Sequence, residues 1–158
     1  MKILNKKGFS ILEYILIILL LGIVFSLTSM TYNDWRQDVL LKNNKEEMRS
    51  YLLRAQQLAS AAASSTDWGL HLEIDSYTLF QGSIYNPADS NNIVRFLQGN
   101  TILNPDTSLS DGAGGYTSDL IFIKFTGQTV NTGTISIIVP NQPSIFTSIN
   151  IESLGVID

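Results

Sequence analysis

An almost unbroken apolar run near the start of the chain constrains the fold most. Ile, Leu, Val, Phe and Gly dominate residues 9–30. A helix over these residues would be about 33 Å long, which matches a hydrocarbon core of about 30 Å. Lys2, Lys6 and Lys7 precede the run, and the positive-inside bias places such residues in the cytoplasm. The sequence therefore predicts one transmembrane helix, with the bulk of the chain outside the cytoplasm.

One acidic residue, Glu13, interrupts this apolar run near its start. A carboxylate at the centre of a membrane helix costs about 2.5–3.5 kcal/mol, so an acid in such a segment indicates a function and needs a partner. The function of Glu13 therefore depends on the identity of that partner.

After the membrane segment, the apolar residues occupy one face of a helix. They recur at spacings of four and three residues, as in an amphipathic helix: Met48, Leu52, Ala55, Ala59 and Ala62, with Tyr51 and Leu58 beside them. No proline occurs before Pro87, so nothing interrupts the helix. We expect one continuous helix over Phe9–Ala63, whose second part is residues 31–63.

From residue 64 the pattern changes to the alternation typical of strands. Leu70, Leu72 and Ile74 alternate with polar residues, and a turn at Asp75 leads into Tyr77–Gln81, which predicts a hairpin. Further strands are expected at Ile93–Leu97, Leu120–Phe125, Thr134–Val139, Ile149–Ile151 and Gly155–Ile157, and loops at Asn86–Asn92 and Asn104–Thr117. Leu120–Phe125 is apolar on both faces, as in a covered central strand. The fold class is therefore α+β, with a small antiparallel sheet packed on the Ala-rich face of the helix.

Composition excludes several classes of function. The chain of 158 residues has no cysteine, so it can form neither a disulfide framework nor a thiolate metal site. From Ser64 onward the chain has nine acidic residues and only two basic ones, Arg95 and Lys124. Such an acidic domain repels nucleic acid, whose binding depends on Lys and Arg.

The sequence Lys6-Lys7-Gly8-Phe9, followed by Glu13 and the long apolar run, resembles the class III signal of type IV prepilins and type II secretion pseudopilins. The resemblance implies that a prepilin peptidase cuts between Gly8 and Phe9 and that the amine of Phe9 is then methylated. Glu13 stands at the fifth mature position, where this family keeps a glutamate. The implied organisation is a leader at residues 1–8, a transmembrane and assembly segment at 9–30, a helical continuation at 31–63 and a β-rich head at 64–158.

Cleavage would supply the partner that Glu13 needs. The amine created at Phe9 has an ordinary pKa near 8 and is positively charged at neutral pH. Two opposite charges about 4 Å apart attract by roughly 4 kcal/mol at an effective dielectric constant of 20. Pairing Glu13 with Phe9 of a neighbouring subunit would offset the cost of both charges in lipid and set the register between subunits.

Two differences from the common pattern of major pilins narrow the type of subunit that this chain resembles. Major pilins commonly carry a proline where this chain has Met30, and many have a C-terminal cysteine pair that is missing here. Both favour a minor subunit. Two pairs of segments resemble minor pseudopilins of the H type and related minor pilins: Trp68–Leu72 with Tyr77–Phe80, and Ile149–Ile151 with Gly155–Ile157.

The resemblance implies a minor structural subunit of a type IV pilus or pseudopilus, without cofactor. Its partners would be other pilin or pseudopilin subunits, the prepilin peptidase and the cytoplasmic membrane, and its location that membrane and then the filament. The alternatives are a tip-displayed subunit for adhesion or DNA uptake, and a membrane-anchored domain unrelated to filaments. A cleaved secretory signal has an apolar core of only about 7–15 residues, whereas an uncleaved anchor would have this length. No nucleophile with a base and no phosphate-binding loop is recognisable, so we expect no enzyme.

Two groups of residues could bind metal ions. His71 and Glu73 would share one face of a strand, although the ordinary interpretation is the solvated face of a hairpin. Asp106, Asp111 and Asp119 flank a Gly-rich segment and could supply oxygen ligands to calcium, but their spacing is not that of an EF-hand, and such loops are usually turns. We therefore expect no metal site.

Overall fold

The computed structural model describes residues 10–104, 108–129, 131–140, 142–152, 155 and 157. The chain divides into two compact units, Met1–Gln37 and Asp38–Asp158, and each is described by itself. A single α-helix, α1 (Ile11–Ser60), contributes residues to both units. The continuous helix expected from the absence of proline is confirmed over this range.

In the first unit, the backbone N–H groups of Glu13 and Tyr14 both donate to the carbonyl of Ser10, at 3.0 and 3.3 Å, where α1 begins. The described residues include no helix that is long and apolar enough to cross a membrane. The predicted transmembrane segment, residues 9–30, includes Phe9 and the side chains of residues 27–30, which lie outside the described part. It stays a prediction.

In the second unit, α1 ends at Ser60, three residues before the predicted end. Ala62 follows with φ of 50° in the left-handed region, and a short 3-10 helix, η1 (Ala63–Ser65), leads into the strands. The carbonyl of Ala59, in the last turn of α1, accepts from the N–H of Ala62 and from that of Phe125, each at 2.9 Å. These two bonds satisfy a helix-end acceptor that α1 itself leaves open.

Four antiparallel strands form the first sheet, in the order β3-β2-β1-β7. They are β1 (Trp68–Leu72), β2 (Ser76–Gln81), β3 (Ile93–Phe96) and β7 (Asp119–Phe122). The predicted hairpin is confirmed as β1 and β2, with Leu70 opposite Leu79. The prediction that Leu120–Phe125 forms a covered central strand is wrong. β7 is an edge strand and buries alternate residues. At its outer edge, the N–H of Ile121 donates to the side-chain oxygen of Asn131.

A second antiparallel sheet forms where the sequence suggested only one. Its strands are β4 (Ile102–Leu103), β5 (Ser108–Ser110), β6 (Tyr116–Thr117), β8 (Thr132–Val139) and β9 (Gln142–Ile151). β8 pairs with β4, β5 and β9, and β5 pairs with β6. The predicted loop Asn104–Thr117 therefore contains two short strands, and β9 starts seven residues before the predicted strand. Ile157, predicted to lie in a strand, makes a single bridge to Ile151.

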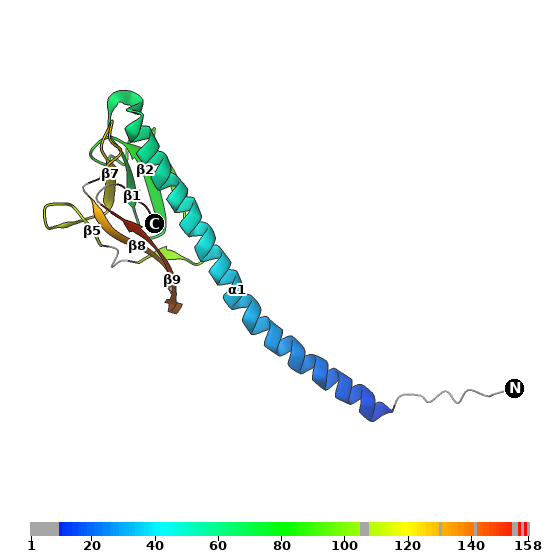
Figure 1. The fold of residues 1–158 in the computed structure, drawn as a ribbon. Helices are drawn as coiled ribbons and strands as arrows, with labels where there is room; N and C mark the ends of the chain where they lie inside the picture. Colours follow the sequence, from blue (N-terminus) through cyan, green and yellow to red (C-terminus); the bar gives the residue numbers. More distant parts are fainter. Residues whose placement is uncertain are drawn as a thin grey trace. The chain divides into compact units, whose positions relative to one another are not determined.

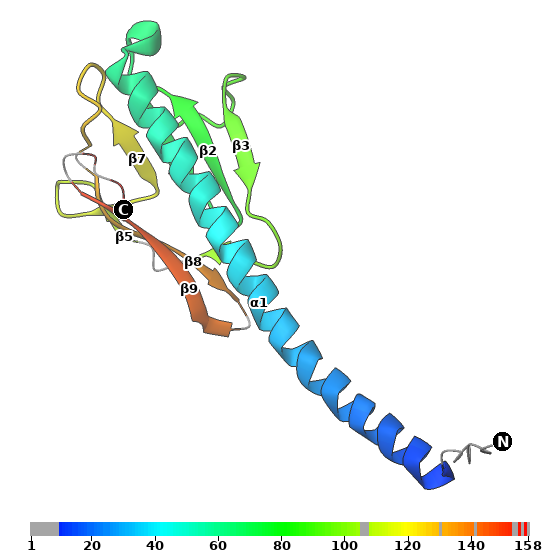
Figure 2. The ribbon, with the colours of Figure 1, turned by 45° about the vertical axis from the view of Figure 1, so that its right-hand side comes forward.

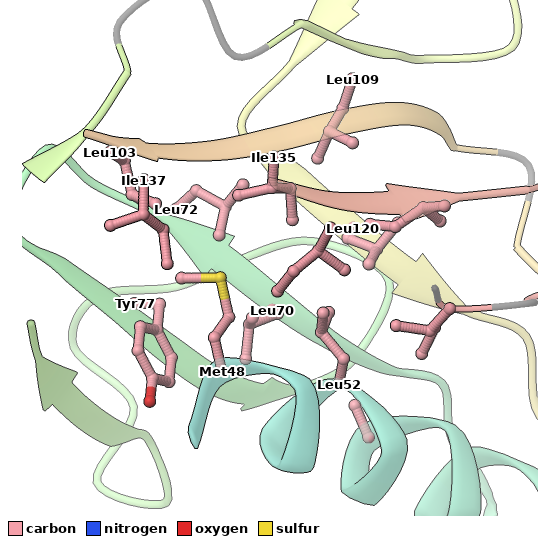
Figure 3. Packing of buried hydrophobic residues seen from close by; sticks show 14 of the residues in the cluster. Met48, Leu52, Leu70, Leu72, Tyr77, Leu103, Leu109, Leu120, Ile135 and Ile137 are labelled. Carbon is pink, nitrogen blue, oxygen red and sulfur yellow. The ribbon is translucent and has the colours of Figure 1, made fainter. Parts of the chain in front are cut away.

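In the second unit, α1 packs against both sheets through the predicted apolar face. Figures 1 and 2 show its cyan and green turns beside β2 and β8. In Figure 3, Met48 and Leu52 of α1 point toward Leu70, Ile137 and their neighbours on the strands. Buried α1 residues in this core are Leu41, Met48, Leu52, Ala55 and Ala59. Ala62 differs from the prediction, because it lies in the turn after α1 and is only partly buried. The α+β class is confirmed.

One tyrosine hydroxyl lies inside this core. Tyr77 is 1% exposed, and the described residues offer its hydroxyl oxygen no hydrogen-bond partner. Burial, and next the nearby Glu47 carboxylate, raise the pKa of Tyr77 well above its ordinary value. The phenol therefore remains neutral and acts as a packing residue, with its ring edge-on to that of Tyr51 at 5.6 Å between centroids.

Candidate functional site

Glu13, the acid singled out by the sequence, lies in the first turn of α1 and is exposed. In this position its negative charge interacts favourably with the positive end of the helix dipole. The described part of the chain gives the carboxylate neither an ion-pair partner nor a hydrogen-bond donor. The structure thus leaves Glu13 available to a group from another molecule.

The side chains around Glu13 on α1 are large, apolar and exposed. Between Ile11 and Phe25 their exposed fractions run from 43% at Ile17 to 80% at Ile11. They are Ile11, Leu12, Tyr14, Ile15, Leu16, Ile17, Ile18, Leu19, Leu20, Leu21, Ile23, Val24 and Phe25. They occupy every side of the helix, because consecutive residues are exposed over four turns. A helix that is apolar all round is one that lipid or other helices cover.

Gly8 and Phe9, the predicted cleavage site, and the methylation predicted at Phe9 lie outside the described residues. The structure therefore tests neither cleavage nor the proximity of Phe9 to Glu13. Gly22, on the same helix, has no atom within 4 Å of the position that a Cβ would take. A neighbouring helix could approach α1 closely there, because glycine has no side chain to separate the two backbones.

The sequence suggested Glu73 as the carboxylate beside His71 at a possible metal site, but the structure places Asp119 nearer to the imidazole. His71 on β1 lies directly opposite Asp119 on β7, and its Nδ1 is 2.5 Å from an Asp119 carboxylate oxygen. Glu73 is farther, at 3.8 Å from Nε2. The ring of Tyr85 stacks on His71 with 3.9 Å between centroids, and Phe80 packs edge-on to Tyr85. This cluster attaches the loop between β2 and β3 to the outer face of the first sheet.

The possible calcium loop is a turn between β5 and β6. Asp106 lies outside the described residues, and Asp119 is engaged by His71. The Asp111 carboxylate accepts the N–H groups of Ala113 and Gly115, both at 2.8 Å. These bonds, that of Ala113 first, lower the pKa of Asp111. In the described part of the chain, no three His, Asp or Glu side chains are placed to hold a metal ion.

Sequence patterns missed the pairing of His71 with Asp119. The two residues stand 48 positions apart, and no local periodicity reveals the register between β1 and β7. The only sequence signal was that His71, the one histidine of the chain, lies on a strand with acidic residues elsewhere in the head.

No protein-family model matches the sequence, and no curated protein matches it. Among solved structures, the chain is similar to the minor pseudopilin EpsH from the type II secretion system of Vibrio cholerae. The TM-score is 0.54 at 16% sequence identity, and the alignment covers 77% of this chain and 93% of the EpsH chain. The likeness shows a pilin-like fold, in which a long helix packs against antiparallel sheets. At the level of fold, the resemblance read from the sequence is confirmed.

Proposed function

We propose that this chain is a minor structural subunit of a type IV pilus or a type II secretion pseudopilus. One observation carries the proposal: Glu13 stands unpartnered, among the described residues, on a helical surface that is otherwise exposed and apolar. Its place five residues after Gly8, and the pilin-like fold of the chain, support the same role.

In the proposed pathway, the chain first inserts in the cytoplasmic membrane through residues 9–30, with Lys6 and Lys7 on the cytoplasmic side and the head outside. A prepilin peptidase then removes residues 1–8, and the new amine of Phe9 is methylated. The methylated amine keeps its positive charge at neutral pH and pairs with Glu13 of a neighbouring subunit. Any other stagger between the helices would leave a charge without a partner in an apolar bundle, so the pair selects the register.

The experiment measures processing and incorporation separately. Intact mass of the chain from membranes should correspond to residues 9–158 with one methyl group. Filaments sheared from cells should contain the chain, and Glu13→Leu should reduce its share at least about tenfold without preventing cleavage, because a loss of only 1.4 kcal/mol of pairing changes an equilibrium tenfold.

Glu46→Gln is the matched control, since it removes one exposed carboxylate from the later part of α1. It should leave incorporation unchanged. A mature chain that keeps Met1–Gly8 would overturn the proposed processing. Glu13→Leu at parental levels in filaments would overturn the pairing.

DNA capture at a tip is the weaker alternative. Of the two basic residues after Ser64, Arg95 donates through Nε to the hydroxyl of Tyr51. Lys124 is the other, and two cations among nine acids cannot form the basic stripe that nucleic acid requires.

A further inference from the structure

β9 forms one edge of the second sheet, and this edge is long. The strand has ten residues and pairs with β8 along one side, so the backbone groups of its other side point away from the sheet. β4 and β6, at other edges of the same sheet, have two residues each. A long strand edge is a surface on which another extended chain can pair.

Proteins usually protect such edges with charged residues, prolines or bulges. In the first sheet, β3 carries Arg95, and the side chain of Asn131 accepts a backbone N–H at the outer edge of β7. On β9, a bulge and Pro143 protect only the first residues, before regular pairing begins at Phe146. Residues 125–151 contain no charged side chain. The segment 146–150, which we call the open edge, therefore has none of these protections.

The outer side of β9 already accepts an extended backbone next to the open edge. Ile151 pairs with Gly133 of β8 on one side, and Ile157 makes an antiparallel bridge to Ile151 from the other. Among the described residues, no further strand continues this pairing along the open edge. The bridge thus shows which kind of backbone fits this side of β9, namely an antiparallel one.

Contacts with α1 give the position of the open edge. The carbonyl of Gly155 accepts from Gln56 at 2.9 Å, and that of Ile157 accepts from Arg49 at 3.3 Å. These residues run toward the start of α1, so β9, which is antiparallel to Ile157, runs away from it. The open edge precedes Ile151 and therefore lies toward the turns of α1 before Arg49. Figures 1 and 2 show the start of β9 beside these earlier turns.

Basic residues occupy this side of α1. Lys42 and Lys45 stand seven and four residues before Arg49, so the helical period places all three on the same side. Lys42 is exposed, and Lys45 and Arg49 are half-buried. We call these three residues the basic flank. Asp38, one turn before Lys42, is acidic and ends it.

The basic flank has no acidic partner within the part of the chain that the structure describes. The ion pairs there join only His71 to carboxylates. Arg49 donates through Nη2 to the carbonyl of Ile157, but its Nε is buried without a hydrogen-bond acceptor among the same residues. A buried donor without an acceptor is unfavourable. A carboxylate brought in along the open edge would pair with these cations.

We propose that an extended acidic segment of a different subunit of the same assembly pairs antiparallel with the open edge, with a carboxylate against the basic flank. The backbone of the segment would bond the outward N–H and C=O groups of β9. Phe146, whose side chain is 62% exposed, would gain a neighbour across the strands. The inference rests on the proposed function, because the filament brings different subunits beside the head.

The test is photo-cross-linking of the full-length chain in membranes and filaments, with mass spectrometry of the cross-linked peptides. The chain has no cysteine, so Ser148→Cys directs a thiol-reactive benzophenone to the open edge alone. Ser90→Cys, in the exposed loop between β2 and β3, is the control site. Ser148 should give at least about ten times more adduct than Ser90. The cross-linked peptide should belong to another subunit and contain Asp or Glu.

Charge variants test the basic flank. Lys45→Glu should reduce the adduct at Ser148 at least about tenfold, because it places a carboxylate against the incoming acid. Arg54→Glu is the matched control: Arg54 is an exposed cation of α1, nine residues after Lys45 and hence on the opposite side of the helix. It should leave the adduct unchanged. Neither side chain is buried, so both variants should keep the parental melting temperature.

Hydrogen exchange distinguishes strand pairing from proximity. In the open edge, the amides that face away from β8 should exchange at least about ten times more slowly in the filament-bound chain than in the chain solubilised from membranes. The amides of β3, at the edge that carries Arg95, should exchange at the same rate in both. Phe146→Asp should abolish the added protection of the open edge, and the head should stay folded because this side chain is exposed.

Adduct at the level of the Ser90 control, or adduct that Lys45→Glu leaves unchanged, would overturn the proposal. So would adducts with lipid or with twice the mass of this chain, because the membrane or a second copy would then occupy the edge. A chain that enters filaments without added protection of the open edge would refute this contact alone. The expected adduct from a chain that keeps Met1–Gly8 would refute the proposed processing and leave the contact standing.

Discussion

Asn44 of α1 and Gln98 of the loop after β3 bind each other through two hydrogen bonds. The Asn44 amide donates to the Gln98 carbonyl at 3.0 Å, and its oxygen accepts the Gln98 N–H at 2.9 Å. The same amide donates to the hydroxyl of Thr101 at 2.8 Å. Asn44 is 1% exposed, so these bonds satisfy a buried amide and fasten the loop to α1.

Replacing Asn44 should therefore destabilise the head. In Asn44→Leu, the backbone N–H of Gln98 loses its acceptor. The carbonyl of Gln98 keeps only the hydrogen bond from the Thr101 hydroxyl. A buried group without a partner costs about 1–3 kcal/mol, so we expect a loss of about 2–3 kcal/mol in the free energy of unfolding. Denaturant titration measures it. Asn43→Leu, at an exposed neighbour on α1, is the control and should change the value by less than about 0.5 kcal/mol.

Gln56 should hold the C-terminal segment on α1. Its amide donates to the carbonyls of Gly127 and Gly155, at 3.1 and 2.9 Å. Gln56→Ala removes both donors and should cost about 1–3 kcal/mol. Hydrogen exchange at the Gly155 amide, which donates to Glu152, should become faster. Gln57→Ala, at the exposed next position, should leave both measurements near the parental values.

Gly127 should not tolerate a side chain. Its φ is +65°, and an added Cβ would collide with the Ser60 hydroxyl, which would have to rotate away, and would lie 3.3 Å from the Gln56 carbonyl. Gly127→Ala should lower the free energy of unfolding by more than about 1 kcal/mol, because strain and a collision combine. Gly114→Ala separates the two causes, since Gly114 also has positive φ but no atom within 4 Å of the added Cβ. An equal loss in both variants would contradict the role of the collision.

Because of Asp111, the stability of the turn between β5 and β6 should depend on pH. Hydrogen bonds from Ala113 and then Gly115 lower the pKa of its carboxyl in the folded chain. A lowered pKa means that the carboxylate stabilises the turn above the ordinary value of about 3.9, and that this contribution is lost as pH falls through the folded pKa.

Titration of the Asp111 carboxyl by NMR should thus give a pKa below about 3.9. Exchange of the Ala113 and Gly115 amides should accelerate at lower pH still. Asp111→Asn keeps an oxygen acceptor without the charge, so its turn should lose this dependence on pH. A carboxyl that titrates at or above the ordinary value would refute the prediction.

Local patterns predicted the elements that depend on neighbours in sequence. The face from Met48 to Ala59 follows the helical period, and Leu70 to Gln81 follows the period and turn of a hairpin. Both are confirmed. The error at Leu120–Phe125 has a physical cause. Its apolar residues on both faces resemble a central strand, but Ile123 to Phe125 leave the sheet in a turn whose Phe125 N–H donates to the carbonyl of Ala59.

Sequence alone determined the helix with its apolar run, the position of Glu13 within it, and the order of helix before strands, because period and charge are properties of neighbouring residues. Tertiary structure alone decided that there are two sheets, that His71 faces Asp119 rather than Glu73, and that Phe125 is held on the carbonyl of Ala59. These depend on strand register and on contacts between residues far apart in the chain, which only the packing of the whole head selects.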